Sequence, residues 1–132
     1  MKKDRDLGLL ILRIGVGVLL LLHGIAKLKG VAFIEGILAS KGLPGFLAYG
    51  VYITEVVAPI LVIIGYRTRL ASLFIIFGMF FAMFLVHPSN IFQLNEVGGW
   101  GVELLGLFIF GALSLAISGS GKFALSSKNK WD

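Results

Sequence analysis

The sequence predicts an all-α integral membrane protein, a four-helix bundle with a short interfacial helix between its first and second spans. Of its 132 residues, 58% are hydrophobic and only 14% are charged. A soluble chain of this length could not bury so much apolar surface. The apolar residues concentrate in four long runs with short segments between them. We therefore expect residues 1–132 to form one membrane domain in contact with the lipid bilayer.

The first half of the chain contains two of the four expected spans. Residues 7–26 are numerous enough to cross about 30 Å of hydrocarbon as a helix. Residues 28–45 mix apolar and polar groups at helical spacing, which predicts a short helix in the membrane interface, ended by Gly42 and Pro44. The second span follows at about residues 46–65.

The second half supplies the third span, at about residues 70–87, and the fourth, at about residues 98–118. Eight lysines and arginines then fall on the side of both termini, and three fall on the other side. By the positive-inside rule, both termini are cytoplasmic. The expected location is the plasma membrane of a bacterium or archaeon, crossed several times.

The composition also excludes several classes of function. The chain has no cysteine, so thiol relays, iron–sulfur clusters and thiolate zinc sites are excluded. Electron transfer would therefore need a bound cofactor or a partner protein. The net charge of +5 does not indicate nucleic-acid binding, because the basic residues lie at helix ends rather than along one stripe.

Function is expected where ionisable side chains interrupt the apolar runs, because charges inside a bilayer are costly and occur mainly at functional sites. By helical rise, the two histidines and two of the glutamates share the outer half of the bundle. The candidate catalytic residues are Glu55, Glu103 and His87, and the candidate ligand-binding residues are Arg13, His23, Lys27 and Trp100.

Three of these features have a structural alternative. Arg13 lies several Å along the helix axis from Glu55, so the two could form a buried ion pair that only joins the first two helices. Pro59 cannot donate to the carbonyl of Glu55, which predicts a kink for ligand binding or for packing. Phe80 and Phe84 share a helix face with the histidine that ends the third span, and could hold a flat ring or contact lipid.

The cofactor stays open at this stage. A quinone suits an aromatic face topped by imidazole, and the two histidines with two carboxylates also resemble a metal or haem site. The sequence lacks a local ligand spacing such as HxxxH or ExxH, so a metal or haem is less favoured than a quinone and we assign no metal ligands.

Six segments carry a family resemblance: LRIGVGVLLLLHGIAKL, EGILASKGLPG, TEVVAPILVIIGYRTRLAS, VHP, NEVGGWGVELL and GSGKFALS. From about Leu9 to Ser127 the chain resembles the DoxX family of small four-helix membrane proteins. The resemblance implies an association with oxidoreductases, since some members are small subunits of quinone-reducing complexes and others are linked to oxidative or quinone stress. It implies no assigned catalytic residue.

The leading hypothesis is a membrane subunit of, or accessory to, a redox complex, which binds a quinone or similar lipophilic ligand in the outer polar cluster. Whether the chain is itself an enzyme is open. One alternative is a small-solute or proton-coupled permease that works as a homo-oligomer. Another is a non-catalytic membrane anchor for a partner oxidoreductase.

Overall fold

The computed structural model describes residues 2–132, and within them it contains helices, turns and no strand. The predicted all-α class is confirmed. In chain order the elements are α1 (Arg5–Ala26), η1 (Lys27–Lys29), α2 (Ala32–Ser40), η2 (Gly45–Tyr49), α3 (Gly50–Tyr52), η3 (Ile53–Val57), α4 (Ala58–Ile64), α5 (Thr68–Val86), η4 (Pro88–Asn90) and α6 (Glu103–Ser118).

Among residues 2–132, three helical segments are long and apolar enough to cross a membrane: Arg5–Lys29, Gly45–Ile64 and Thr68–Val86. They match the first three predicted runs to within a few residues. Helix α6 is apolar but has only 16 residues, because it begins at Glu103 rather than at residue 98. Gly98 has a φ of 88°, a left-handed conformation that suits a turn and not a helix.

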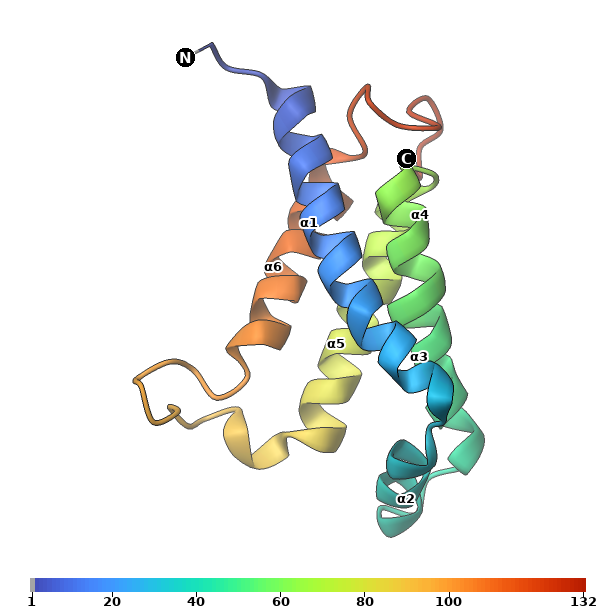
Figure 1. Ribbon diagram of the computed structural model, residues 1–132, viewed down its shortest axis with the longest axis vertical. Coiled ribbons are helices and arrows are strands. Elements are labelled where there is room, and N and C mark those ends of the chain that lie inside the picture. The colour runs from blue at the N-terminus through green and yellow to red at the C-terminus, as the bar shows by residue number, and fades with distance from the viewer. Residues whose placement is uncertain (1) are drawn as a thin grey trace.

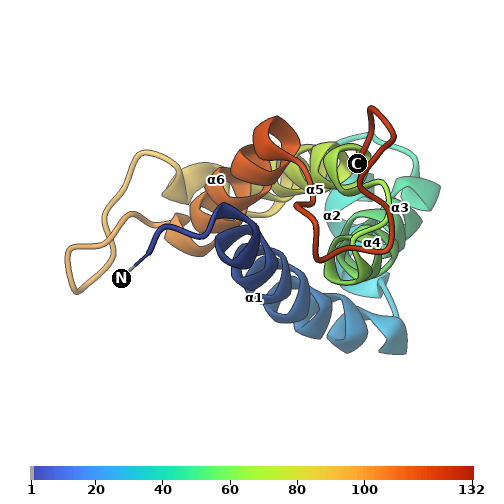
Figure 2. The same cartoon turned by 90° about the horizontal axis from the view of Figure 1, so that it is seen from above.

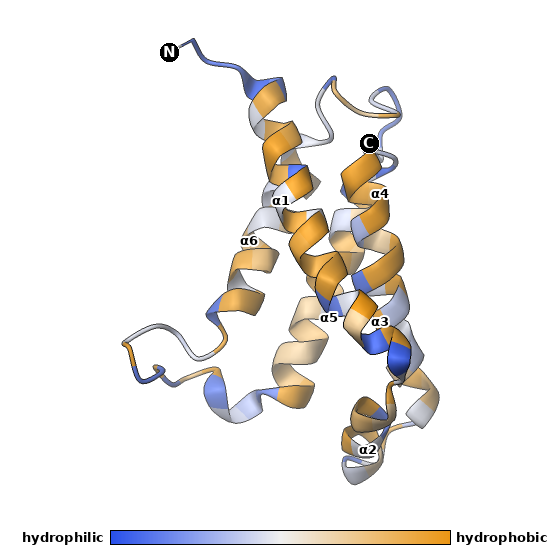
Figure 3. Cartoon of the chain, in the orientation of Figure 1, coloured by the Kyte–Doolittle hydropathy of each residue, from blue (hydrophilic) through white to orange (hydrophobic). Residues whose placement is uncertain are grey.

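The four helical segments pack as a closed ring (Figures 1 and 2). Helix α1 contacts α4, α4 contacts α5, α5 contacts α6, and α6 contacts α1. The centre of the ring is a hydrophobic core whose fully buried members include Leu20, Val62, Ile75, Met79 and Leu115. Many large apolar side chains are exposed, as expected for a chain whose helices face lipid. The hydropathy colouring shows that hydrophobic residues occupy most of the length of the long helices (Figure 3).

The two ends of the ring differ. Both termini lie at one end, whereas α2 and the connection between α5 and α6 lie at the other (Figure 1). Helix α2 is the short helix predicted within residues 28–45. Its buried residues Ile34 and Leu38 form a second core with Val31, Ala48 and Leu85, which fastens α2 to the end of α5.

The segment that carries Glu55 changes helix type at this residue. Residues Ile53–Val57 form a π-helical turn, in which the N–H of Ala58 donates to the carbonyl of Ile53. Pro59 follows inside α4 and has no N–H to donate to the Glu55 carbonyl. Where the sequence predicts a kink, the structure has a widened turn at Glu55, of the kind that recurs at functional sites.

Residues 119–132 fold over the turn between α4 and α5. The N–H groups of Leu125 and Ser126 donate to the carbonyls of Ile64 and Gly65, at 3.0 Å each. The last carbonyls of a helix have no partner within it, and these two bonds satisfy them at the end of α4.

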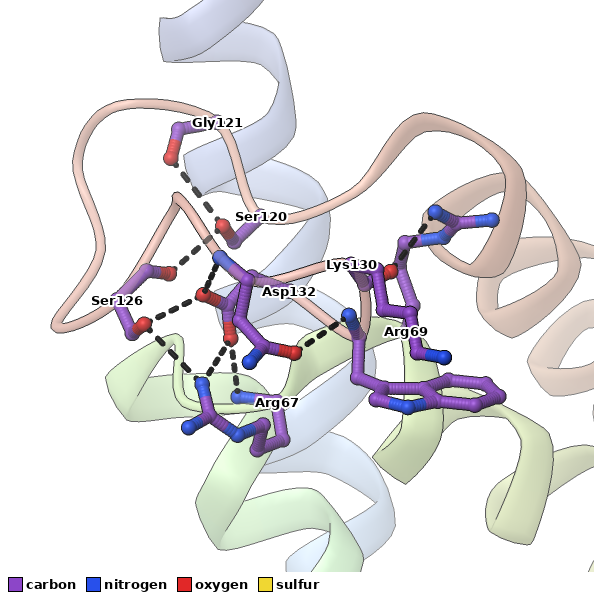
Figure 4. Close-up of polar contacts among 9 residues, drawn as sticks. Arg67, Arg69, Ser120, Gly121, Ser126, Lys130 and Asp132 are labelled. Carbon is purple, nitrogen blue, oxygen red and sulfur yellow. Dashed lines mark hydrogen bonds and ion pairs between the residues drawn. The ribbon is translucent and has the colours of Figure 1, made fainter.

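The same segment also caps the start of α5 (Figure 4). The carbonyl of Trp131 accepts from the N–H groups of Arg69 and Leu70, at 2.9 and 3.3 Å. The Asp132 carboxylate accepts from the N–H of Arg67 at 3.1 Å and from its guanidinium at 2.9 Å. Because Arg67 itself provides no capping side chain, residues 131 and 132 supply what the helix lacks.

Candidate functional site

A cavity of about 760 Å³ lies among α1, the π turn, α5, the α5–α6 connection and the start of α6. This volume is within the range of pockets that enclose small organic ligands. Most of its lining is apolar, and it includes Leu20, Met79, Phe81 and Phe108. Six of the seven residues selected from the sequence also line it: His23, Lys27, Glu55, His87, Trp100 and Glu103.

The most buried polar residue of the cavity lining is Glu55, which forms an ion pair with Lys27. Glu55 is 5% exposed, and both of its carboxylate oxygens accept from Lys27 Nζ at 2.7 Å. The Lys27 side chain is 34% exposed, so its ammonium also faces the cavity. The hydroxyl of Tyr52 donates to the Lys27 carbonyl at 2.9 Å and holds the turn after α1 in place.

Gly24 allows this pair to form. A Cβ at Gly24 would lie 2.0 Å from the carbonyl oxygen of Glu55 and 2.9 Å from Val56 Cγ2. Only a glycine lets α1 approach the π turn so closely. Lys27 follows three residues later, just past the end of α1, and reaches the carboxylate from there. The carbonyl that Pro59 leaves without its usual donor is thus covered by α1.

The ion pair of Arg13 with Glu55, considered from the sequence, is not formed. Arg13 is 1% exposed and donates to carbonyls: Nε to Val62 and Nη2 to Ile63, both at 2.9 Å, and Nη1 to Ser120 at 3.1 Å and to Phe123. Two of these carbonyls belong to the last turn of α4, where the carbonyls have no N–H donor within the helix. Arg13 does not line the cavity, and it joins α1, α4 and residues 119–132.

The other selected residues of the lining are exposed. The His23 ring meets the Phe108 ring edge to face, with centroids 6.1 Å apart. His87 follows the last residue of α5, and Glu103 is the first residue of α6; both side chains are exposed. The Trp100 indole packs against Gly106, where a Cβ would lie 2.5 Å from Cζ3. A ligand inside the cavity can therefore meet polar groups contributed by α1, the π turn, the end of α5 and the start of α6.

Phe80 and Phe84, for which the sequence left ring binding or lipid contact open, do not line the cavity. Phe80 and Phe84 stack with centroids 6.4 Å apart, but both are exposed and outside the cavity. Phe81, which is partly buried, lines the cavity instead, together with Phe77, which is itself largely exposed. Neighbouring positions on a helix point in directions about 100° apart, so a small rotation of α5 about its axis decides which aromatic rings face inward.

Two polar residues of the lining were missed from the sequence. Thr54 precedes Glu55 and packs closely against Gly78 of α5, and Asn95 belongs to the connection before α6. The sequence offered a signal for each: Thr54 adjoins Glu55, and Asn95 begins the NEVGGWG string. Among residues 2–132, no three His, Asp or Glu side chains are grouped closely enough to hold a metal ion.

Comparison with known proteins adds to this geometry. The family model described as DoxX matches residues 8–88. The chain is 30% identical to "Putative oxidoreductase CatD" of Bacillus subtilis, over 95% of this chain and 89% of that protein. It is 29% identical to "Inner membrane protein YqjF" of Escherichia coli, over 99% and 100%, and 35% identical to an uncharacterized protein of Haemophilus influenzae, over 97% and 95%. No solved structure matches the chain.

Proposed function

Because this chain belongs to the DoxX family of membrane proteins, we propose that it is a membrane-embedded subunit of, or accessory to, a redox complex. In this proposal, its cavity binds a quinone or a similar lipophilic ring. One relative, CatD, is named as an oxidoreductase, and another, YqjF, as an inner membrane protein. Since the chain has no cysteine, the electrons come from a partner oxidoreductase and not from thiols.

The cavity is the observation that carries this proposal. Its apolar and aromatic walls suit a flat hydrophobic ring, and its volume of about 760 Å³ suits a ring with a short tail. Its lining combines a buried ion pair, Lys27 with Glu55, with the two imidazoles of His23 and His87. These side chains can hydrogen-bond the oxygens of a quinone ring.

Each polar residue then has a defined role. Lys27 has an N–H beyond the two that it gives to Glu55, and this N–H donates to one ring oxygen. His23 and His87 donate to the other ring oxygen, while Trp100 covers the opening of the cavity. A bound quinone would supply two-electron chemistry coupled to the uptake of two protons. Glu55 and Glu103 exchange protons with the ring oxygens and with water at the rim.

The same proposal includes a topology of four spans in the plasma membrane with both termini in the cytoplasm. At 1.5 Å per residue, the 16 residues of α6 cover about 24 Å, and the ring packing of α6 against α5 and α1 favours a full crossing. Because the chain has no cysteine, single cysteines can report sidedness. Ser89→Cys should react with an impermeant maleimide added outside intact cells, and Ser127→Cys only after the cells are opened. The opposite pattern would invert the topology.

Fluorescence of Trp100 provides the binding test. The chain has two tryptophans, so Trp131→Phe leaves Trp100 as the only emitter. In lipid nanodiscs, a short-chain ubiquinone should quench this emission saturably. Glu55→Gln and His87→Ala should each weaken the binding at least tenfold, because the first removes the carboxylate that holds the Lys27 ammonium in place and the second removes a donor to the ring.

Phe84→Ala is the matched control, because Phe84 is exposed on α5 and lies outside the cavity. It should bind the quinone like the parent. Quenching that does not saturate, or that is equally strong in all variants, would refute the quinone site. If the protein then copurified with a redox enzyme, the anchor function would be favoured. Solute uptake by an oligomer in vesicles would favour the permease.

A further inference from the structure

Residues 119–132 form an ordered surface at the end of the molecule that carries both termini (Figure 1). Their backbone bonds to α4 and α5, as described above. A further bond joins the N–H of Ser120 to the carbonyl of Asp132 at 2.7 Å and closes the segment on itself. Side chains that do not take part in this capping are therefore presented outward in a defined arrangement.

The outward side chains are basic and apolar. We call them the tail surface: Lys122, Phe123, Leu125, Lys128, Lys130 and Trp131, all of them exposed. Two of the lysines lie over aromatic rings, with Lys122 Nζ 5.1 Å from the Phe123 centroid and Lys130 Nζ 5.5 Å from that of Trp131. Lysine beside exposed tryptophan, phenylalanine and leucine is the composition of segments that lie in a membrane interface.

The end of the molecule that carries the tail surface is net positive, because eight lysines and arginines lie there against three aspartates. Asp132 pairs with Arg67, Asp4 caps the start of α1, and Asp6 accepts from the backbone N–H of Lys122. The ion pairs of residues 2–132 are Lys27 with Glu55 and Arg67 with Asp132, and neither uses a lysine of the tail surface. Lys2, Lys3 and Arg5 add exposed positive charge at the same end.

We propose that the tail surface binds the headgroups of anionic phospholipids. The phosphate oxygens meet the three lysines, and Phe123, Leu125 and Trp131 insert at the level where headgroups meet acyl chains. This surface lies at the opposite end of the molecule from α2 and is separate from the cavity. The proposal therefore does not depend on the quinone function.

Native mass spectrometry in detergent can test it, with phosphatidylglycerol as the anionic probe and phosphatidylcholine as the zwitterionic probe. The test variant carries Lys122→Gln, Lys128→Gln and Lys130→Gln. Each lysine near an anionic surface contributes about fivefold in affinity, so three should contribute about a hundredfold. Lys29→Gln with Lys41→Gln is the matched control, because these two exposed lysines lie at the other end.

The wild type and the control should both prefer phosphatidylglycerol, and the triple variant should lose most of this preference. A triple variant with arginine at the three positions keeps the charge and should keep the preference. It also separates loss of charge from a disturbed fold. A wild type without preference for phosphatidylglycerol would overturn the proposal, as would a triple glutamine variant that retains it. Binding of an acidic peptide without that lipid preference would point to a protein partner and would overturn it equally.

Discussion

Replacing Gly24 with alanine should destabilise the protein and disturb the cavity in one step. The new Cβ would lie 2.0 Å from the Glu55 carbonyl oxygen, where non-bonded heavy atoms need about 3.5 Å. The helices therefore have to separate by roughly 1.5 Å, and backbone atoms cannot move aside as a side chain can. Overpacking of this kind lowers the free energy of unfolding by about 1 to 3 kcal/mol, and we expect a value near the top of this range because the contact is with backbone.

Gly15→Ala is the matched control on the same helix. A Cβ at Gly15 meets nothing within 4 Å, so this change should leave the stability within about 1 kcal/mol of the wild type or raise it slightly. Thermal unfolding in detergent, followed by circular dichroism, compares the two variants. Gly24→Ala should also weaken quinone binding, because it moves Lys27 away from Glu55. Equal melting temperatures for both variants would refute the close approach of α1 to the π turn.

Three further predictions follow from the buried charges. Arg13→Met should lower the free energy of unfolding by at least about 3 kcal/mol, measured by thermal unfolding, because it strips the donors from four carbonyls. Lys27→Met should cost about 3 to 5 kcal/mol in the same assay by leaving a buried carboxylate alone, and adding Glu55→Leu should recover much of this loss. Acid should release residues 119–132. Burial by itself raises the pKa of the Asp132 carboxyl, but the hydrogen bonds that it accepts outweigh burial and hold that pKa well below its usual value. Its stabilising effect is therefore complete above about pH 4, the ordinary range of an aspartate, and is lost as the pH falls below it. Trp131 emission in a Trp100→Phe protein should report the release, and in Asp132→Asn it should no longer depend on pH in that range.

Each of these predictions has an outcome that would contradict it. An Arg13→Met protein as stable as the wild type would mean that water replaces the guanidinium at the carbonyls. If the protein with both Lys27→Met and Glu55→Leu is no more stable than the protein with Lys27→Met alone, the loss of stability does not come from an unpaired Glu55 carboxylate. Acid release that persists in Asp132→Asn would assign the transition to another carboxyl.

Much of the architecture could be predicted because it depends on local properties. Runs of about 20 apolar residues specify membrane helices by length alone, and three of them were located to within a few residues. The predicted fourth span begins at residue 98, because Gly98 and Gly99 count as apolar. In the structure Gly98 adopts a left-handed turn conformation, and the helix begins only at Glu103.

The candidate site was only partly predictable. Rare ionisable residues within apolar runs drew attention to Glu55, His23, His87 and Glu103, and all four line the cavity. The capping role of residues 131 and 132 gave no such signal, because a short polar tail without periodicity does not show which helix ends it will meet.

The sequence by itself therefore determined the class of the fold, the approximate extent of its main helices and the residues worth testing. Only the tertiary structure decided that Lys27, and not Arg13, pairs with Glu55, and that Phe77 and Phe81, and not Phe80 and Phe84, line the cavity. The hydrophobicity of a helix and the spacing of its polar residues are properties of one continuous segment, so they can be obtained from the sequence directly. The partner of a side chain depends on the rotation of each helix about its own axis, and this rotation is set by contacts such as Gly24 against Glu55, between residues far apart in the chain.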